Sequence, residues 1–210
     1  MRLGRALPLV ALLLVTAALG AHADIRPRLL PEGGLPPEID RRWWIEVGTS
    51  SPARTGHTGF YQTGLSTGGG LEFPVTRGTV FTVGLRGGIW PLTGSVLPSD
   101  TLTGGSAYFA GLVFGGRSHV TVGSSPYSVV FGVDFGPALL HFGKIDDRAG
   151  GLSQRLPAER DFGTVLGLSF GGEYRPEDAI GLLWRFDEEW FSTSTTSSCS
   201  NVEIGLTRPW

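Results

Sequence analysis

Apolar and polar residues alternate with a period of two along most of the chain after residue 42. In segment 179–191, Trp184 and Phe186 share one parity, and Arg185 and Asp187 share the other. Successive side chains of a β-strand point to opposite faces, so this pattern predicts a strand with one apolar and one polar face. Eight segments show it: 43–50, 62–74, 79–90, 104–115, 127–142, 161–175, 179–191 and 201–207. We therefore predict an all-β fold of eight strands.

The connections between these strands alternate in length. The second and third strands join near 75–78 and the sixth and seventh at 175–178, whereas 91–103 and 144–160 are long. Short turns at one end and long loops at the other are typical of outer-membrane barrels. Lipid cannot hydrogen-bond a free strand edge, so such a sheet has to close. We predict an eight-stranded antiparallel transmembrane β-barrel, an up-and-down meander, over 43–210.

In this barrel the parity rich in Gly, Ser, Thr and charge faces the lumen, which side chains just fill when there are eight strands. The other parity faces lipid, with Glu188 and His141 as exceptions near the outer ends, where Trp90 and Trp190 are also expected. Charges in so narrow a lumen need partners. The predicted lumen charge network is Glu46, Glu72, Arg86, Asp134, Glu173, Arg175, Arg185, Asp187, Glu189 and Glu203. We favour a salt-bridge network that rigidifies the barrel over a pore or gate.

The first 23 residues have the features of a secretory signal peptide. Arg2 and Arg5 precede the apolar run 7–19, and Ala21 and Ala23 fit the small-x-small cleavage rule. The run is too short to span a bilayer as a helix. We expect cleavage after Ala23 and export to the outer membrane. Residues 24–42, rich in Pro and Arg, are predicted to be a periplasmic linker.

Composition narrows the function classes. The 33 Gly residues argue against a helical bundle, and the net charge of −2 gives no basic surface for nucleic acid. The single cysteine, Cys199, cannot form an intramolecular disulfide, but in the Ser/Thr tract 192–200, a predicted outer loop, it could pair with another molecule. A soluble, exported lipocalin-like binding barrel is an alternative, because alternation does not say which face points inward. The abundant Gly on the polar face favours the membrane barrel.

Four segments carry a likeness to a known family. They are GGGLEF at 68–73, VVFGVDFG at 129–136, YRP at 174–176 and VEIGLTRPW at 202–210. They resemble the eight-stranded OmpA-like outer-membrane barrels of Gram-negative bacteria, although Arg208 and Pro209 depart from the usual terminal pattern. The resemblance implies contact with outer-membrane lipid and lipopolysaccharide, and insertion by the barrel-assembly machinery through the C-terminal strand ending at Trp210. It implies a structural, surface-interaction or minor solute-passage role.

Candidate catalytic residues are few. Residues 167–171, GLSFG, match the G-x-S-x-G elbow, but that motif needs a sharp strand-to-helix turn and here lies within a predicted strand. By resemblance to outer-membrane lipid A deacylases and acyltransferases, His141, Glu188 and Ser192 form a candidate set at the outer rim. The first two would lie about 9–10 Å apart, too far for a triad.

The three histidines that follow the signal peptide complete the search for chemistry. His57, His119 and His141 are expected in an outer loop, in a periplasmic turn and at the outer rim, so they cannot share a metal. We therefore expect a non-enzymatic protein with no catalytic residues, no metal site and no cofactor.

Overall fold

The computed structural model describes residues 41–53, 59–76, 78–93, 100–122, 125–149, 152–176, 180–193 and 197–210. These residues form β1 (Arg42–Pro52), β2 (Gly64–Thr76), β3 (Thr79–Trp90), β4 (Asp100–Gly104), β5 (Ala107–Thr121), β6 (Tyr127–Phe142), β7 (Ile145–Ala149), β8 (Leu152–Leu156), β9 (Glu159–Tyr174), β10 (Gly181–Ser192) and β11 (Ser197–Pro209). The predicted signal peptide, its cleavage after Ala23 and the linker up to residue 40 lie outside the described residues.

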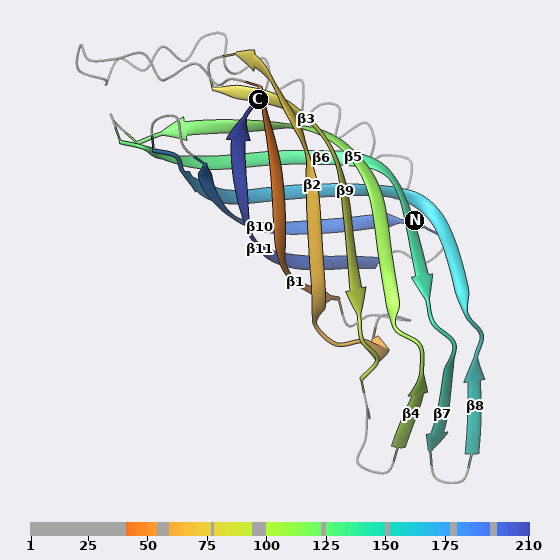
Figure 1. Cartoon of the computed structure of the whole chain (residues 1–210). Coiled ribbons are helices and arrows are strands. Elements are labelled where there is room, and N and C mark those ends of the chain that lie inside the picture. Colours follow the sequence, from red (N-terminus) through yellow and green to blue (C-terminus); the bar gives the residue numbers. More distant parts are fainter. Residues whose placement is uncertain are drawn as a thin grey trace.

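Eight of these strands close into an antiparallel barrel in the order β1-β2-β3-β5-β6-β9-β10-β11 (Figure 1). β11 pairs with β1 and closes the sheet, with Arg42 opposite Pro209. Both chain ends of the barrel therefore lie at the same end. The predicted fold class is confirmed, and each predicted strand corresponds to one barrel strand. The main differences are at strand ends: β1 begins at Arg42, which was expected in the linker, and β5 continues six residues beyond residue 115.

The register determines how the strands are inclined. Starting at Val129 of β6, we step from each residue to its paired partner on the next strand, by way of β9, until the path has passed once around the barrel. It returns to β6 at Leu139, ten residues further along. With about 3.3 Å per residue and about 4.7 Å between strands, this stagger tilts the strands by about 40° from the barrel axis. Each residue along a strand then adds about 2.5 Å of height.

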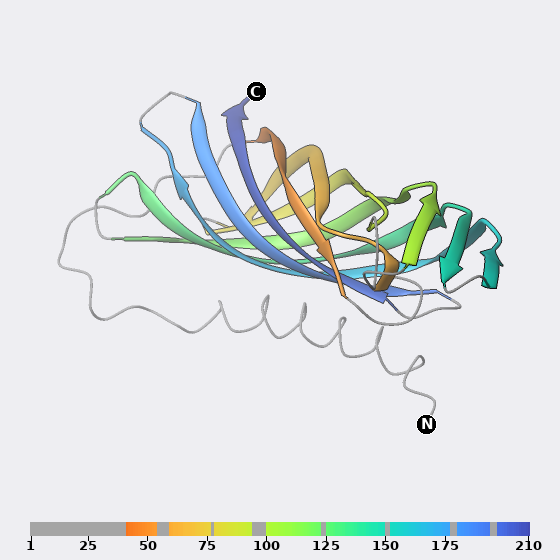
Figure 2. The same cartoon turned by 90° about the horizontal axis from the view of Figure 1, so that it is seen from below.

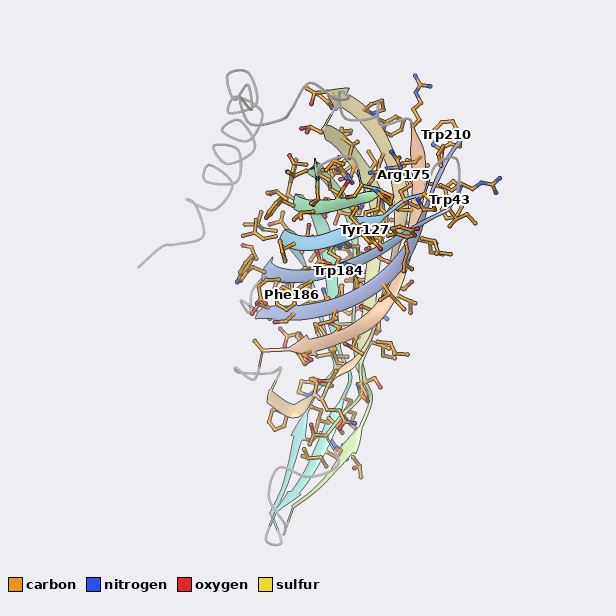
Figure 3. All side chains as sticks on the ribbon, turned by 90° about the vertical axis from the view of Figure 1, so that its left-hand side faces the viewer. Trp43, Tyr127, Arg175, Trp184, Phe186 and Trp210 are labelled. Atoms are coloured by element: carbon orange, nitrogen blue, oxygen red, sulfur yellow. The ribbon has the colours of Figure 1, made fainter. Side chains whose placement is uncertain are left out.

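The outer face of the barrel is apolar on all eight strands. Large side chains exposed there include Ile45, Val47, Leu65, Leu71, Phe81, Leu85, Ile89, Leu112, Phe131, Phe135, Phe162, Phe170, Leu182, Trp184, Phe186, Val202, Ile204 and Leu206. Two of them, Trp184 and Phe186 on β10, are labelled in Figure 3. A soluble lipocalin-like barrel needs the opposite polarity, with its aliphatic face inside, so the structure contradicts that alternative.

Three short strands form a second sheet where the sequence predicts only long loops. β4, β7 and β8 pair in that order and project from the barrel away from the C-terminus (Figures 1 and 2). They prolong β5, β6 and β9, which are neighbours in the same order, after breaks at 105–106, 143–144 and 157–158. Strands of five residues with such breaks leave too little alternation to be read from sequence. We call this sheet the outer sheet.

No helix in the described ranges is long and apolar enough to cross a membrane.

Candidate functional site: the charged lumen

The centre of the lumen is organised around Arg185 of β10. Its Nε lies 2.7 Å from Asp187 Oδ2, and its Nη2 lies 3.1 Å from Glu203 Oε2 of β11 and also binds Glu46 of β1. All four side chains are almost fully buried. One arginine therefore joins three strands across the interior.

A second arginine, Arg86 of β3, binds four carboxylates from β1, β6 and β10. The closest oxygens belong to Glu189 at 2.9 Å, Asp134 at 3.2 Å, Asp187 at 3.5 Å and Glu46 at 3.7 Å. The last two carboxylates also bind the arginine of β10. The two arginines and their partners therefore form one connected cluster.

A second group of ionisable residues lies nearer the chain ends of the barrel. Arg42 of β1 binds Glu72 of β2, and its Nη1 contacts Glu173 of β9 at 2.8 Å. The ring of His119 packs between them, with Nε2 at 2.8 Å from Arg42 Nη2 and Nδ1 at 3.2 Å from Glu173. Thr207 of β11 donates to Glu173 at 2.6 Å. Arg42 thus joins β1 to strands across the lumen.

Trp44 of β1 connects the two groups. The guanidinium of Arg117 lies 4.4 Å from the centre of its ring, and that of Arg185 lies 5.5 Å away, within the range of cation–π attraction. A Cβ atom on Gly84 would lie 2.7 Å from this ring, and one on Gly68 would lie 3.0 Å from it and 2.7 Å from Glu46 Oε1. These two lumen-facing glycines therefore provide the space that the indole occupies.

Arg117 of β5 completes the network through a contact of 2.7 Å with Glu72. Every strand of the barrel now contributes, and carboxylates outnumber arginines. The carboxylates are Glu46, Glu72, Asp134, Glu173, Asp187, Glu189 and Glu203, and the arginines are Arg42, Arg86, Arg117 and Arg185. Because each arginine serves one to four carboxylates, the loss of one arginine leaves buried negative charge without a partner.

The lumen changes character towards the outer end. On β10, Phe191 follows Glu189 on the same face and starts an apolar cluster. Trp90 packs on Phe109 at 5.2 Å, and Phe109 packs on Phe191 at 5.3 Å between ring centroids. Trp90 is fully buried and donates through its indole N–H to Ser50 Oγ at 2.9 Å, so it does not sit at the lipid interface as expected. The cluster comprises Tyr61, Trp90, Leu102, Ala107, Phe109, Val113, Ala138, Leu140, Phe142, Ile145, Val165, Phe191 and Cys199.

The structure brings together all the residues predicted for the lumen network except Arg175. This residue follows the last residue of β9, is half-buried, and donates its backbone N–H to the carbonyl of Pro126 at 2.9 Å. It stays outside the network because it lies just beyond the strand end, beside the Tyr127–Tyr174 pair, where the regular alternation that puts Glu173 in the lumen has ended.

Three members of the network were not predicted. Arg42 was placed in the linker, Arg117 lay beyond the predicted strand 104–115, and His119 was placed in a turn, although its side chain is only 6% exposed and lies beside Glu173. The available signal was parity: Arg42 is in phase with Glu46, and Arg117 is in phase with Gly111 and Gly115. Alternation would have found them if the strands had been extended by a few residues.

The candidate catalytic set does not assemble. His141 pairs with Arg160 of β9, whereas Glu188 pairs with Leu168 of the same strand. The eight-residue offset along β9 separates them by about 26 Å, far more than their strand spacing suggests. Ser192 pairs with Thr164, between those two levels.

Two other candidates for chemistry also find no support. Ser169, the serine of the G-x-S-x-G match, lies in the middle of β9 without a turn. No group of His, Cys, Asp and Glu suited to a metal occurs among the residues described, which do not include His57.

Cys199 is not in an outer loop. It lies on β11 with 1% of its surface exposed, and its Sγ is 3.5 Å from Glu189 Oε2 and 3.6 Å from Asn201 Oδ1. The thiol therefore occupies the boundary between the charged and apolar parts of the lumen. Pairing with another molecule, which the sequence left open, is blocked in the folded barrel.

Comparison with known proteins supports the fold. No protein-family model matches the chain, and no curated protein sequence matches it. Among solved structures, Neisserial surface protein A superposes with a TM-score of 0.50 at 12% identity, over 81% of this chain and 96% of that one. Ail of Yersinia pestis gives 0.48 at 12% over 80% and 99%, and the N-terminal β-barrel domain of Pseudomonas aeruginosa OprF gives 0.41 at 11% over 79% and 96%. At such low identity the first of these likenesses shows the barrel architecture alone.

Replacing Arg185 with methionine should strongly destabilise the barrel. Glu46, Asp187 and Glu203 would lose a shared cation inside a dry lumen, at a cost of about 3–5 kcal/mol. Urea unfolding of the protein in phosphatidylcholine vesicles, followed by tryptophan fluorescence, measures this change. The matched control is Arg175→Met, which removes an arginine outside the network and should cost less than about 0.5 kcal/mol. Equal losses for the two variants would show that the network does not hold the strands together.

The thiol of Cys199 should react with maleimide only after unfolding. In folded protein in detergent its burial shields it, and heating in dodecyl sulfate should expose it. A Thr103→Cys variant in a Cys199→Ser background is the control, because Thr103 is exposed on β4 and should react at once. Rapid labelling of Cys199 in the folded state would contradict its position in the lumen.

Proposed function

We propose that this protein is a non-enzymatic β-barrel of the bacterial outer membrane with a structural and surface-interaction role. The observation that carries the proposal is the inverted polarity of a closed sheet: charges bind one another inside and large apolar side chains cover the outside. In water such an exterior would be a severe aggregation hazard. In a bilayer it is the surface that the hydrocarbon requires.

The height of the apolar surface fits a membrane. On β9, the outward positions from Tyr174 to Phe162 span twelve residues, about 30 Å of height at the derived tilt. On β10, the outward positions from Leu182 to Trp190 span eight residues, about 20 Å, and are apolar except for Glu188 near the outer end. These values bracket the apolar band of about 25 Å that is usual for such barrels.

The same architecture supports the proposed export route and partners. The proposed partners are outer-membrane lipid and, in the outer leaflet, lipopolysaccharide, whose hydrocarbon would cover the outward apolar band. β11 pairs with β1 through eleven residue pairs, so the terminal strand that ends at Trp210 is the one that closes the barrel. Recognition of this strand by the barrel-assembly machinery, after removal of the signal peptide at Ala23, is part of the proposal. Nucleic acid is not an expected partner.

The lumen supports a closed barrel rather than a solute channel. The apolar cluster caps the outer end, and the charges below it are bound to one another. A permeating ion would have to leave water and cross packed aromatic rings, which is expensive. Of the roles expected from the sequence, minor solute passage is therefore less well supported than a structural or surface-interaction role. The outer sheet is the element available for contacts at the cell surface.

The orientation in the membrane can be tested with single cysteines in a Cys199→Ser background. A membrane-impermeant maleimide applied to intact cells should label Thr103→Cys on the outer sheet. Ser125→Cys, near the start of β6 at the opposite end, should be labelled only after the outer membrane is permeabilised. Both variants should fractionate with the outer membrane and migrate faster on gels unheated than heated. Recovery of the protein in osmotic-shock fluid would reject the proposal.

The closed lumen predicts no channel activity. The folded protein in planar lipid bilayers should show no conductance steps above the background of empty membranes. The variant carrying Phe109→Ala and Phe191→Ala, which removes two rings of the apolar cap, should gain small, unstable openings, whereas Phe131→Ala on the lipid-facing side should not. Discrete steps in the unmodified protein would contradict a sealed barrel.

A further inference from the structure

Three side chains form a row across the outer wall of the barrel where it meets the outer sheet. Tyr108 of β5 pairs with His141 of β6, and His141 pairs with Arg160 of β9. All three have the parity of the exposed apolar positions on their strands, so they point outward. The Tyr108 and His141 rings stack with centroids 4.7 Å apart. Directly opposite positions on adjacent strands lie about 5 Å apart, so the row is about 10 Å wide.

Arg160 is the accessible cation of this row. Its side chain is exposed, and no ion pair to it is found within the part of the chain that the structure describes. The His141 ring is partly exposed. Its Nδ1 is buried against the wall without a hydrogen-bond partner among the described residues, so only the opposite edge of the ring can face a ligand. The adjacent acids Glu159 and Asp161 have the opposite parity on β9, so they do not face Arg160. An exposed guanidinium beside a partly exposed imidazole and a tyrosine ring is an arrangement that suits an anion.

The position of the row along the barrel indicates which anion. His141 and Arg160 each lie fourteen residues from the stacked Tyr127–Tyr174 pair near the chain-end rim. At the derived tilt this is about 35 Å of height, whereas the apolar band of such barrels is about 25 Å tall. The row therefore lies just above the hydrocarbon on the outer side, at the level of lipid headgroups.

The neighbouring residues match the two parts of a lipid. Immediately below the row, Ala110, Leu139 and Phe162 form the next outward row, and Phe162 is 78% exposed. Above it lie two further cations, Lys144 in the break before β7 and Arg155 on β8 of the outer sheet.

The acid between these two cations does not cancel their charge. Asp146 lies 3.2 Å from Lys144 and 2.8 Å from Arg155. The hydrogen bond from Arg155, and then that from Lys144, hold the pKa of Asp146 below its usual range, so this carboxylate stays charged. The cluster nevertheless keeps one net positive charge. The wall is thus apolar below and cationic above.

We propose that Tyr108, His141 and Arg160 bind the phosphate group of a lipid headgroup in the outer leaflet. Arg160 forms the charge-assisted hydrogen bonds, Tyr108 offers its hydroxyl, and His141 lies between them and presents the edge of its ring opposite the buried Nδ1. Phe162 and Leu139 contact the upper part of the acyl chains. The site rests on the proposed function, since it requires the barrel to sit in a membrane with these strands facing the outer leaflet.

Binding can be measured by native mass spectrometry of the refolded mature chain in dodecyl maltoside micelles. The probes are diphosphorylated lipid A and the same lipid without phosphates. The unmodified protein should retain the phosphorylated lipid at least about fivefold better, the ratio expected for one or two charge-assisted contacts at a wet site. Arg160→Gln and His141→Gln should each remove most of this preference, and Arg160→Lys should keep part of it.

The matched control is Arg208→Gln, which removes an exposed arginine at the opposite end of the barrel and should retain the lipid as the unmodified protein does. Equal retention of both lipids, or an unchanged preference in Arg160→Gln, would overturn the site. Displacement of the lipid by millimolar inorganic phosphate would also overturn it, because the site would then recognise a free anion. Heat-modifiable migration of every sample reports folding separately. Its absence in the unmodified protein would reject the membrane barrel, whereas a folded barrel without phosphate preference rejects only the site.

Discussion

The structure depends on a closed sheet that separates lipid hydrocarbon on the outside from a narrow lumen on the inside. Because side chains alternate with a period of two, successive residues face these two environments in turn. Every outward residue must suit hydrocarbon, and every inward charge needs a partner of opposite charge in a narrow, buried lumen. Trp184, Arg185 and Phe186 on β10 show the consequence within three residues: two exposed rings flank a buried guanidinium. The high glycine content follows from the same constraint, because Gly68 and Gly84 leave the space in which Trp44 lies between two arginines.

The lumen network contributes more to the choice of one strand register than to the free energy of unfolding. Desolvating so many charges costs about as much as their attraction returns, so the intact network adds little net free energy. It does penalise alternatives, because a slip of one residue between two strands would turn Arg86 or Arg185 towards lipid and leave their carboxylates unpaired. Since all eight strands contribute a member, only the observed register and shear satisfy them together. That argument also explains why carboxylates are shared: Glu46 and Asp187 each bind two arginines from different strands.

Much of this could be predicted from the sequence, because period-two alternation acts locally. It identified the eight strands, the fold class and the acids of the lumen. It failed where the information is not local. Arg42 and Arg117 lie beyond the clear alternation, and strand ends are determined by the pairing partner. His141 and Glu188 looked close because strand order alone says nothing about shear, which displaces them by eight residues along β9. Trp90 and Cys199 were misplaced because an apolar cap inside a polar lumen breaks the rule that apolar residues face lipid.

The barrel has two unlike sides, and the difference comes from the strands that continue into the outer sheet. On β6 and β9 the outward face stays apolar up to Leu139 and Phe162 and then becomes cationic. On the opposite wall it becomes polar lower down: Ser200 donates to Glu188 at 2.5 Å, and Ser51 bonds Thr63 at 2.8 Å. A membrane of uniform thickness cannot match both sides of an upright barrel, so the barrel tilts or the bilayer thins beside β10 and β11. The outer sheet, the taller apolar wall and the exposed Arg160 all lie on the same side. Lipid packing and surface contact are therefore coupled through β5, β6 and β9. An outer-leaflet lipid held at this wall would help to set the angle at which the outer sheet leaves the membrane.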